Sequence, residues 1–254
     1  MARNQEQLWL EGPERPLARE GEAHVWRAGL EPGGPALRRL WEMLSADERR
    51  RADRFHFRRD REHFVAARGG LREILGRYTG AAPGSLRFSY DGFGKPSLSG
   101  PAPGVEAGGA PPRFNVSHSG GVALYAVTAG REVGVDIERV REDFAGLDIA
   151  RNFFSPDEVA ALSALPAGER AAAFFDCWTR KEAYIKARGQ GLSHPLHLFT
   201  VSLTPGRPAA LLRTDDDPAE AARWSLVELF PGEGYRAALA VEGEVSSLRC
   251  WSLF

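Results

Sequence analysis

A carboxylate and an amine lie four residues apart within an apolar segment, at Glu182 and Lys186. In a helix, residues at this spacing are neighbours on one face. They would border a largely apolar stripe made of Phe174, Trp178, Lys181 and Ile185. An exposed pair of this kind contributes only about 0.2–0.5 kcal/mol to stability. The segment is therefore either a core helix with a surface ion pair or part of an enzyme site.

Two further carboxylates occur in the strand-like segment 133–138. Its apolar residues alternate with the others, so Asp136 and Glu138 would project from the same face of the strand. Carboxylates about 7 Å apart along a strand repel each other unless a cation lies between them. Their oxygens suit Mg²⁺, which takes its remaining ligands from water and phosphates. A third carboxylate from a packed helix would complete such a site, and the alternative is a solvated strand face.

Groups that suit a phosphate occur near two turns. Ser117 and His118 end a strand-like run just before the glycine pair 120–121, which is typical of a hairpin. A hydroxyl, an imidazole and exposed turn amides each offer a donor to an anionic oxygen. The second turn, Gly94-Lys95-Pro96, holds a lysine in a rigid position. Each of these side chains is also compatible with an ordinary solvated place.

Taken together, these segments resemble the 4'-phosphopantetheinyl transferase superfamily in its two-domain, surfactin-synthetase-activating form, the Sfp type. The resemblance extends over about residues 25–241 and rests on five blocks in the family's order. The blocks are Gly94-Lys95-Pro96, Phe114-Asn115-Val116-Ser117-His118-Ser119, Gly134-Val135-Asp136-Ile137-Glu138, Phe153-Phe154-Ser155 and Trp178-Thr179-x-Lys181-Glu182-Ala183-Tyr184-x-Lys186-x-x-Gly189-x-Gly191-Leu192.

The resemblance implies an enzyme that transfers the 4'-phosphopantetheine arm of coenzyme A to a serine of an apo acyl or peptidyl carrier protein, releasing adenosine 3',5'-bisphosphate. It implies Asp136, Glu138 and Glu182 as ligands of Mg²⁺, or of Mn²⁺ in its place. Lys186 would contact the pyrophosphate of the substrate coenzyme A, and Glu182, Lys186 and Asp136 would be the catalytic residues. The serine proton would go to Glu182 or to a metal-bound water, because a carboxylate bound to Mg²⁺ has little reason to be basic.

The family's 3'-phosphate pocket would include Ser117, His118, Lys95 and Arg51. Some relatives carry additional basic or hydroxyl side chains on the first long helix, where this chain has Glu48 and Phe64, so the pocket cannot be transferred residue for residue. Nearby arginines could compensate, namely Arg49, Arg50 and Arg54. The segment from Ser99 to Pro112 is rich in Gly, Pro and Ala, which indicates an enlarged surface loop of unknown role.

Two other functions remain open on the sequence alone. A Mg²⁺-dependent phosphodiesterase or nuclease could use the same carboxylates and lysine, but it should present a basic face to nucleic acid. A non-catalytic scaffold that binds coenzyme A or a carrier protein would be expected to lose at least one of the three carboxylates. The chain retains all of them.

Arginines gather in one segment, which the capping-box pattern at Ser45 indicates to be a helix between Ser45 and Asp60. They are Arg49, Arg50, Arg51, Arg54, Arg58, Arg59 and Arg61. Sparse interleaving of aromatic residues argues against a nucleic-acid partner. Carrier proteins generally present acidic helices, so we expect some of these arginines to steer a carrier. The alternative is that they only solvate the helix.

The composition suits an intracellular enzyme. The chain has 254 residues, 43% of them hydrophobic, which is enough for one large core or two smaller ones. No apolar run reaches the roughly 20 residues that span a membrane, and the start has no apolar signal segment. We therefore expect a cytoplasmic protein without a membrane partner. We also expect a monomer, because one chain supplies both halves of the site. Cys177 and Cys250 are interpreted as reduced, buried side chains.

The elements that must position these groups repeat along the chain. The capping-box pattern at Ser45 and the residues 64–65 recur at Ser155 and 174–175 with equal spacing, which places Arg72 opposite Glu182. Strand-like runs with short links that favour antiparallel pairing lie at 23–28, 86–90, 114–118, 122–127, 133–138, 198–203, 224–230 and 235–241. We therefore expect an α+β fold of two pseudo-symmetric halves. Each would be a small, mainly antiparallel sheet packed with a long helix, with the active site in the cleft between them.

The expected domains are residues 1–132 and residues 133–254, and the second would carry the metal site. Residues 1–22 and the last ten residues are expected to be peripheral.

Overall fold

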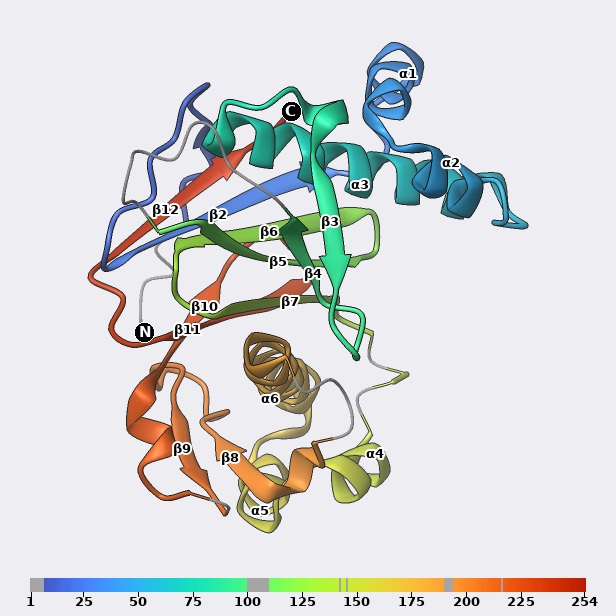
Figure 1. Cartoon of the computed structure of the whole chain (residues 1–254). Helices are drawn as coiled ribbons and strands as arrows, with labels where there is room; N and C mark the ends of the chain where they lie inside the picture. Colours follow the sequence, from blue (N-terminus) through green and yellow to red (C-terminus); the bar gives the residue numbers. More distant parts are fainter. Residues whose placement is uncertain (1–6, 100–109, 142, 145, 190–193, 216) are drawn as a thin grey trace. The chain divides into compact units, whose positions relative to one another are not determined.

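The structure is a computed structural model that describes residues 7–99, 110–141, 143, 144, 146–189, 194–215 and 217–254. Contacts within the chain group it into two compact units (Figure 1). The first unit comprises Leu8–Gly130 and Leu248–Phe254, and the second comprises Arg131–Ser247 together with Gln7. Each unit has an apolar core of its own.

The first unit is built on a five-stranded sheet in the order β1-β12-β2-β6-β5. β2 and β5 both pair antiparallel with β6, while β1 pairs parallel with β12. The hairpin between β5 and β6 turns through Gly120 and Gly121, whose φ angles of 55° and 93° favour glycine, so the predicted turn is confirmed. The strands are β1 (Leu10–Glu11), β2 (Glu22–Gly29), β5 (Pro112–Ser119), β6 (Val122–Ala129) and β12 (Ser247–Ser252).

The long helix α3 (Arg58–Thr79) packs its apolar side on this sheet. Two shorter helices precede it, α1 (Gly34–Met43) and α2 (Ala46–Ala52), and a hairpin of β3 (Arg87–Tyr90) and β4 (Pro96–Ser99) follows it. A short 3₁₀ turn at Pro83–Ser85 links the helix to the hairpin.

The prediction of one helix between Ser45 and Asp60 is wrong. Helix α2 ends at Ala52, where the amide of Phe55 bonds back only three residues to the carbonyl of Ala52. Phe57 then adopts an extended conformation, with φ −93° and ψ 135°, and α3 begins at the next residue. The arginine-rich segment therefore forms a helix, a turn and the start of a second helix.

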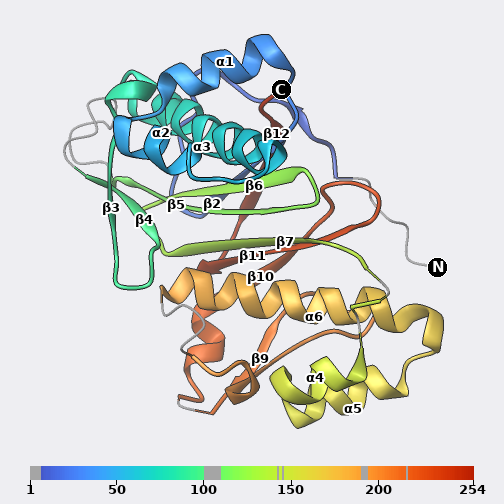
Figure 2. The ribbon, with the colours of Figure 1, turned by 90° about the vertical axis from the view of Figure 1, so that its right-hand side faces the viewer.

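The second unit has a three-stranded antiparallel sheet in the order β10-β11-β7. Figures 1 and 2 show helix α6 lying along one face of this sheet, with the smaller elements on the other side of the helix. The strands are β7 (Val133–Arg139), β8 (Phe199–Val201), β9 (Leu211–Thr214), β10 (Trp224–Leu229) and β11 (Tyr235–Glu242). The helices are α4 (Leu147–Phe153), α5 (Pro156–Ala164) and α6 (Ala167–Arg188), with 3₁₀ turns at Leu196–Leu198 and Glu220–Arg223.

The predicted α+β class is confirmed for both units. Each contains a mainly antiparallel sheet and a helix of 22 residues, α3 or α6, preceded by a short helix with a capping box. The division into domains 1–132 and 133–254 stays a prediction. In the described part of the chain, no helix has both the length and the apolar character needed to cross a membrane.

The expectation that the last ten residues are peripheral is wrong, whereas the peripheral place of residues 1–22 stays a prediction. β12 lies between β1 and β2 in the sheet of the first unit, and Leu253 belongs to the core. Gly12 lies against the indole of Trp26, since a Cβ there would come within 2.0 Å of the ring. Both segments are too short, and in part too polar, to stand out as strands without their partners.

Helix α6 approaches β7 closely at Gly134. A Cβ at this position would lie 2.0 Å from the carbonyl oxygen of Ala183 and 2.4 Å from the amide nitrogen of Ala187. Only glycine therefore allows the backbones of strand and helix to come so near each other. The two alanines directly follow Glu182 and Lys186 in sequence, so this contact sets where the backbone of both residues lies against β7.

Each long helix is tied by a buried ion pair to the short helix before it. The capping-box glutamates Glu48 and Glu158 contact Arg72 and Lys181 at 2.7 and 2.8 Å, respectively. The two predicted capping boxes are thus confirmed. Arg72 and Lys181 therefore play the same structural role in the two units. The sequence repeat had instead placed Arg72 opposite Glu182.

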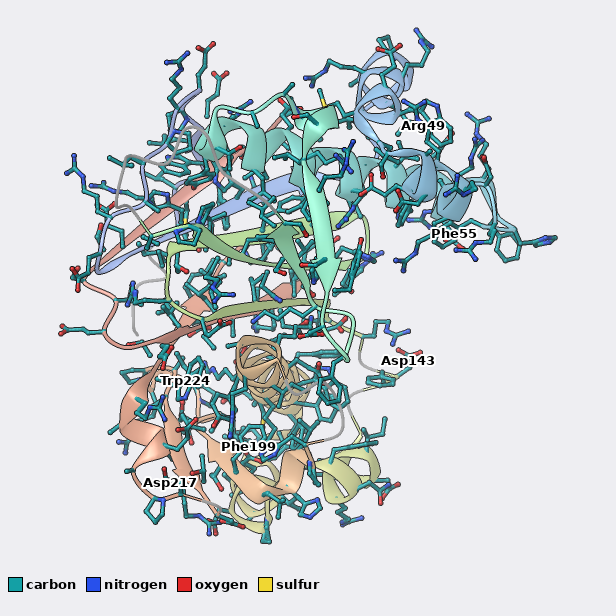
Figure 3. All side chains as sticks on the ribbon, viewed as in Figure 1. Arg49, Phe55, Asp143, Phe199, Asp217 and Trp224 are labelled. Carbon is teal, nitrogen blue, oxygen red and sulfur yellow. The ribbon has the colours of Figure 1, made fainter. Side chains whose placement is uncertain are left out.

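The ammonium of Lys181 is fully buried and fully satisfied. It donates to Glu158 Oε2 at 2.8 Å, to the carbonyl oxygen of Leu196 at 2.8 Å and to that of Phe199 at 2.5 Å. These three acceptors match the three N–H groups of an ammonium. Phe199, labelled in Figure 3, also places its ring centroid 4.2 Å from the nitrogen.

We expect Lys181→Met to lower the free energy of unfolding by about 3–5 kcal/mol, because it leaves the Glu158 carboxylate buried without its cation. Lys181→Arg should also destabilise, since a planar guanidinium does not fit three acceptors arranged around one nitrogen. Urea unfolding measures both. Arg151→Met is the matched control, because its ion pair with Asp148 is exposed and should contribute no more than about 1 kcal/mol. A Lys181→Met protein as stable as that control would contradict the structural role.

Candidate active site

Strand β7 turns Asp136 and Glu138 toward α6. Val133, Val135 and Ile137 occupy the opposite face and are fully buried. The side chain of Asp136 is only 4% exposed, and that of Glu138 is half-buried. The solvated strand face considered from the sequence is therefore wrong for Asp136.

Lys186 reaches Asp136 from α6. Its Nζ lies 2.5 Å from Asp136 Oδ1, and the lysine side chain is 29% exposed. The sequence predicted Lys186 as a neighbour of Glu182 along the helix. The structure adds a direct charge-assisted hydrogen bond from the helix to the strand.

Glu182 carries an unused acceptor in a buried place. Its Oε1 is buried and has no hydrogen-bond partner among the described residues. Burial, together with the charges of Asp136 and Glu138, raises the pKa of Glu182 to about 7, while Lys186 opposes this shift. A buried carboxylate oxygen without a donor, close to two other carboxylates, suits a divalent cation.

The three carboxylates fit Mg²⁺ by type and by electrostatics, but they are not gathered in advance. Within the described residues, no three acidic, histidine or cysteine side chains already lie at metal-ligand spacing. Asp136 Oδ1 instead accepts from Lys186. Side-chain movement must accompany metal binding at this place.

A further cation lies beside Glu138, and sequence reasoning missed it. Arg236 on β11 is directly opposite Glu138 in the strand register, and its Nε lies 3.1 Å from Asp176 Oδ1 on α6. Burial raises the pKa of Asp176 to about 6, although Arg180 and Arg236 oppose this shift. Only the pairing of β7 with β11 could have revealed Arg236, because it lies about 100 residues from Glu138 in sequence.

The first unit has a pocket between α2, α3, the β3–β4 hairpin and β5. Its volume of about 430 Å³ is in the range of small-molecule sites. The predicted residues Arg51 and His118 line it, and so does Gly94 of the predicted lysine turn. The other lining residues are Asp47, Glu48, Arg54, Phe64, Ala67, Arg68, Leu71, Tyr90, Pro96 and Val116.

Two predicted phosphate ligands are placed differently from Arg51 and His118. Ser117 is buried, whereas His118 is exposed, because successive side chains of β5 point to opposite faces. The Ser117 side chain therefore does not join His118 in the pocket. Lys95 follows Gly94 in the hairpin turn, where its amide donates to Asp91 Oδ1 at 2.8 Å.

The two departures from the family pattern have structural roles here. Glu48 is held by its capping box and by Arg68 and Arg72, so its charge is compensated. Phe64 supports Arg51, whose guanidinium lies 5.2 Å from the ring centroid. Of the arginines that could compensate, Arg54 lines the pocket, and the compensation itself stays a prediction.

Arg68 and Tyr90 also line the pocket, and sequence reasoning missed both. Arg68 Nη2 donates to the Tyr90 hydroxyl at 2.7 Å. One comes from α3 and the other from β3, so no spacing within a single element could indicate the pair. Residues 100–109 of the predicted surface loop, and residues 190–192 of the last motif, lie outside the described residues.

Two family models match the chain. Residues 30–131 match "4'-phosphopantetheinyl transferase, N-terminal", and residues 132–240 match "4'-phosphopantetheinyl transferase superfamily". The chain is 40% identical to 4'-phosphopantetheinyl transferase HetI of Nostoc sp., over 92% of this chain and 94% of the relative. It is 31% identical to 4'-phosphopantetheinyl transferase Sfp of Bacillus subtilis, over 65% of this chain and 69% of that relative. The chain therefore belongs to the 4'-phosphopantetheinyl transferase superfamily, as its motifs predicted.

Proposed function

We propose that this enzyme transfers the 4'-phosphopantetheine arm of coenzyme A to a serine of an apo acyl or peptidyl carrier protein. Adenosine 3',5'-bisphosphate is the second product, and Mg²⁺ is the cofactor, with Mn²⁺ as a possible substitute. Membership of the superfamily supports the transfer. One observation supports the metal: Asp136 on β7 and Glu182 on α6 are close enough to affect each other's charge, and Lys186 contacts Asp136.

Asp136, Glu138 and Glu182 would hold the cation. When bound, a divalent cation neutralises charge on the pyrophosphate of coenzyme A. Lys186 would contact the same pyrophosphate, as the family resemblance implies, and its ammonium supplies donors to the anionic oxygens.

The reaction forms a bond from the serine oxygen to the phosphorus that bears the pantetheine arm. The bond from this phosphorus to the bridging oxygen breaks, and the electron pair leaves with adenosine 3',5'-bisphosphate, where Lys186 can stabilise the new charge. The serine proton passes to Glu182 or to water in the site.

Arg51 and His118 would bind the 3'-phosphate of coenzyme A in the pocket of the first unit. Both are donors, and both line the same pocket. Lys95 would act from the adjoining turn, while a phosphate contact of Ser117 stays a prediction, since its side chain is buried on the other face of β5. No separate observation favours a nuclease or a scaffold. A cytoplasmic location, a monomeric state and the absence of nucleic-acid and membrane partners stay proposals.

Removing the metal ligands tests the second unit. At saturating Mg²⁺, Asp136→Asn and Glu182→Gln should each reduce transfer to an apo carrier protein by about 10²-fold or more, with circular dichroism unchanged. Glu138→Gln should reduce it less, because water can replace a half-buried ligand. Mass spectrometry of the carrier measures transfer. Glu169→Gln, an exposed carboxylate on the same helix, is the control. Full activity of Glu182→Gln would rule out its assigned role.

Removing donors from the pocket tests the first unit. Arg51→Ala and His118→Ala should weaken coenzyme A binding about tenfold or more, since a charged hydrogen bond contributes roughly 1.5–3 kcal/mol. Calorimetric titration should use coenzyme A and its 3'-dephospho form. The parent should prefer the 3'-phosphate, and both variants should lose that preference, while the exposed Arg38→Ala keeps it. An unchanged preference in Arg51→Ala and His118→Ala would place the 3'-phosphate elsewhere.

The arginines at the junction of α2 and α3 are available to a carrier. Arg58 is 89% exposed and forms an ion pair with Glu62 of its own helix. Arg49 on α2, labelled in Figure 3, is by contrast half-buried and donates to the carbonyl oxygens of Trp41 and Glu42. An acidic carrier would meet these charges first as it approaches, and the attraction would weaken beyond the screening length of about 10 Å at 0.1 M salt.

Arg58→Glu should raise the KM for an acidic carrier several-fold, because it replaces an attractive surface charge with a repulsive one. The KM for coenzyme A should change less, and the effect on the carrier KM should fade as salt rises. Arg15→Glu, an equally exposed reversal in the same unit, should leave both constants unchanged. If the carrier KM of Arg58→Glu equals that of the parent, the docking surface lies elsewhere, and residues 153–165 of the second unit become the next place to test.

A further inference from the structure

Lysine is rare in this chain. Of its 33 lysines and arginines, only Lys95, Lys181 and Lys186 are lysines. An ammonium is a compact point charge on a flexible stem, whereas a guanidinium is a wide planar fork. Lys181 shows what the rare residue is used for here, because its nitrogen fits among three acceptors. The same question applies to Lys186.

Lys186 occupies the place where a cation is needed. Its Nζ lies 2.5 Å from Asp136 Oδ1, and Asp136 is almost completely buried. The same ammonium opposes the effect of Asp136 and Glu138 on Glu182. In the metal-free protein, Lys186 therefore supplies the positive charge that keeps this set of carboxylates together.

A divalent cation held by Asp136 would lie close to the ammonium of Lys186, whose Nζ is 2.5 Å from Asp136 Oδ1. A doubly charged ion repels a nearby ammonium twice as strongly as a singly charged ion would, and burial of the site reduces solvent screening of that repulsion. The cation must also draw Asp136 and Glu182 into its ligand shell, and the described residues hold no such set in advance. Lys186 has room to leave, since its side chain is 29% exposed and its stem can rotate while α6 stays in place.

We propose that Lys186 occupies the cation position beside Asp136 before the metal binds, and that metal binding displaces its ammonium, which then becomes available to the pyrophosphate. This inference rests on the proposed function. It assigns an order to the reaction, because coenzyme A that arrives before the metal finds the lysine engaged by a buried carboxylate. No covalent bond changes in this step.

Competitive acetylation of the full-length protein tests the proposal, because the chain has so few amines. The reagent is isotopically labelled acetic anhydride at low conversion, at constant pH and ionic strength. The conditions are chelator alone, Mg²⁺ alone, and Mg²⁺ with desulfo-coenzyme A, which has no thiol to react. Cleavage after arginine releases the peptide 181–188, in which fragment ions separate Lys181 from Lys186. Turnover is not needed at any point.

We expect Mg²⁺ alone to raise acetylation of Lys186 at least threefold relative to Lys95, and desulfo-coenzyme A to reverse the increase. Lys181 should stay unmodified throughout, as the reference for a buried amine. Asp136→Asn should show the high level without metal, and Glu169→Gln should behave as the parent does. Acetylation of Lys186 that Mg²⁺ leaves unchanged or lowers would overturn the proposal, even if Asp136→Asn failed to fold.

The outcomes separate this inference from the proposed function. A protein that transfers phosphopantetheine while its Lys186 acetylation ignores Mg²⁺ would overturn only the displacement of Lys186. A protein in which Mg²⁺ releases Lys186, but which modifies no apo carrier, would overturn only the proposed transfer.

Discussion

The contact between β7 and α6 at Gly134 determines the geometry of the candidate metal site. The strand supplies Asp136 and the helix supplies Glu182 and Lys186, so their separation depends on how closely the two backbones approach. A side chain at residue 134 would push the helix away, because even a Cβ would overlap the backbone of Ala183. Backbone packing rather than side-chain reach therefore sets the separation, which is why a lysine and a buried aspartate meet at hydrogen-bond distance.

In both units a buried cation on the long helix anchors the short helix before it, but the cation differs between the units. In each, the glutamate that caps a short helix also receives a buried cation from the long helix, which joins helix start and core packing in one interaction. Arg72 donates from Nε to Glu48 and from Nη1 to the carbonyl oxygens of Pro83 and Leu86. Lys181 serves acceptors that surround a single nitrogen. Breaking either pair is costly because the remaining charge stays buried.

Much of the fold could be predicted, because alternation and capping boxes are local signals. The capping box at Ser155 and the strand at residues 133–138 are examples. The candidate metal ligands were predicted from the order of the motifs. Their burial could not be predicted, since it depends on how α6 covers β7. Ser117 and His118 were predicted as one binding pair, but strand alternation separates their side chains. Arg236 and Arg68 could not be predicted, because their places depend on contacts between segments that are distant in sequence. For Arg236 this contact is the register of β11 with β7, and for Arg68 it is the packing of α3 on the β3–β4 hairpin. The turn after Ala52 was missed because the arginines around it favour helix.

The position of β12 in the sheet of the first unit bears on how the protein is made. This strand follows the whole second unit in the chain, yet it lies between β1 and β2. During translation the second unit can leave the ribosome with all three strands of its main sheet, while the first unit, although synthesised earlier, still lacks an inner strand. Until β12 arrives, β2 has an open edge that can pair with another chain. The first half to be synthesised is thus the last to be completed, and the time spent in that state grows with the length of chain between β2 and β12.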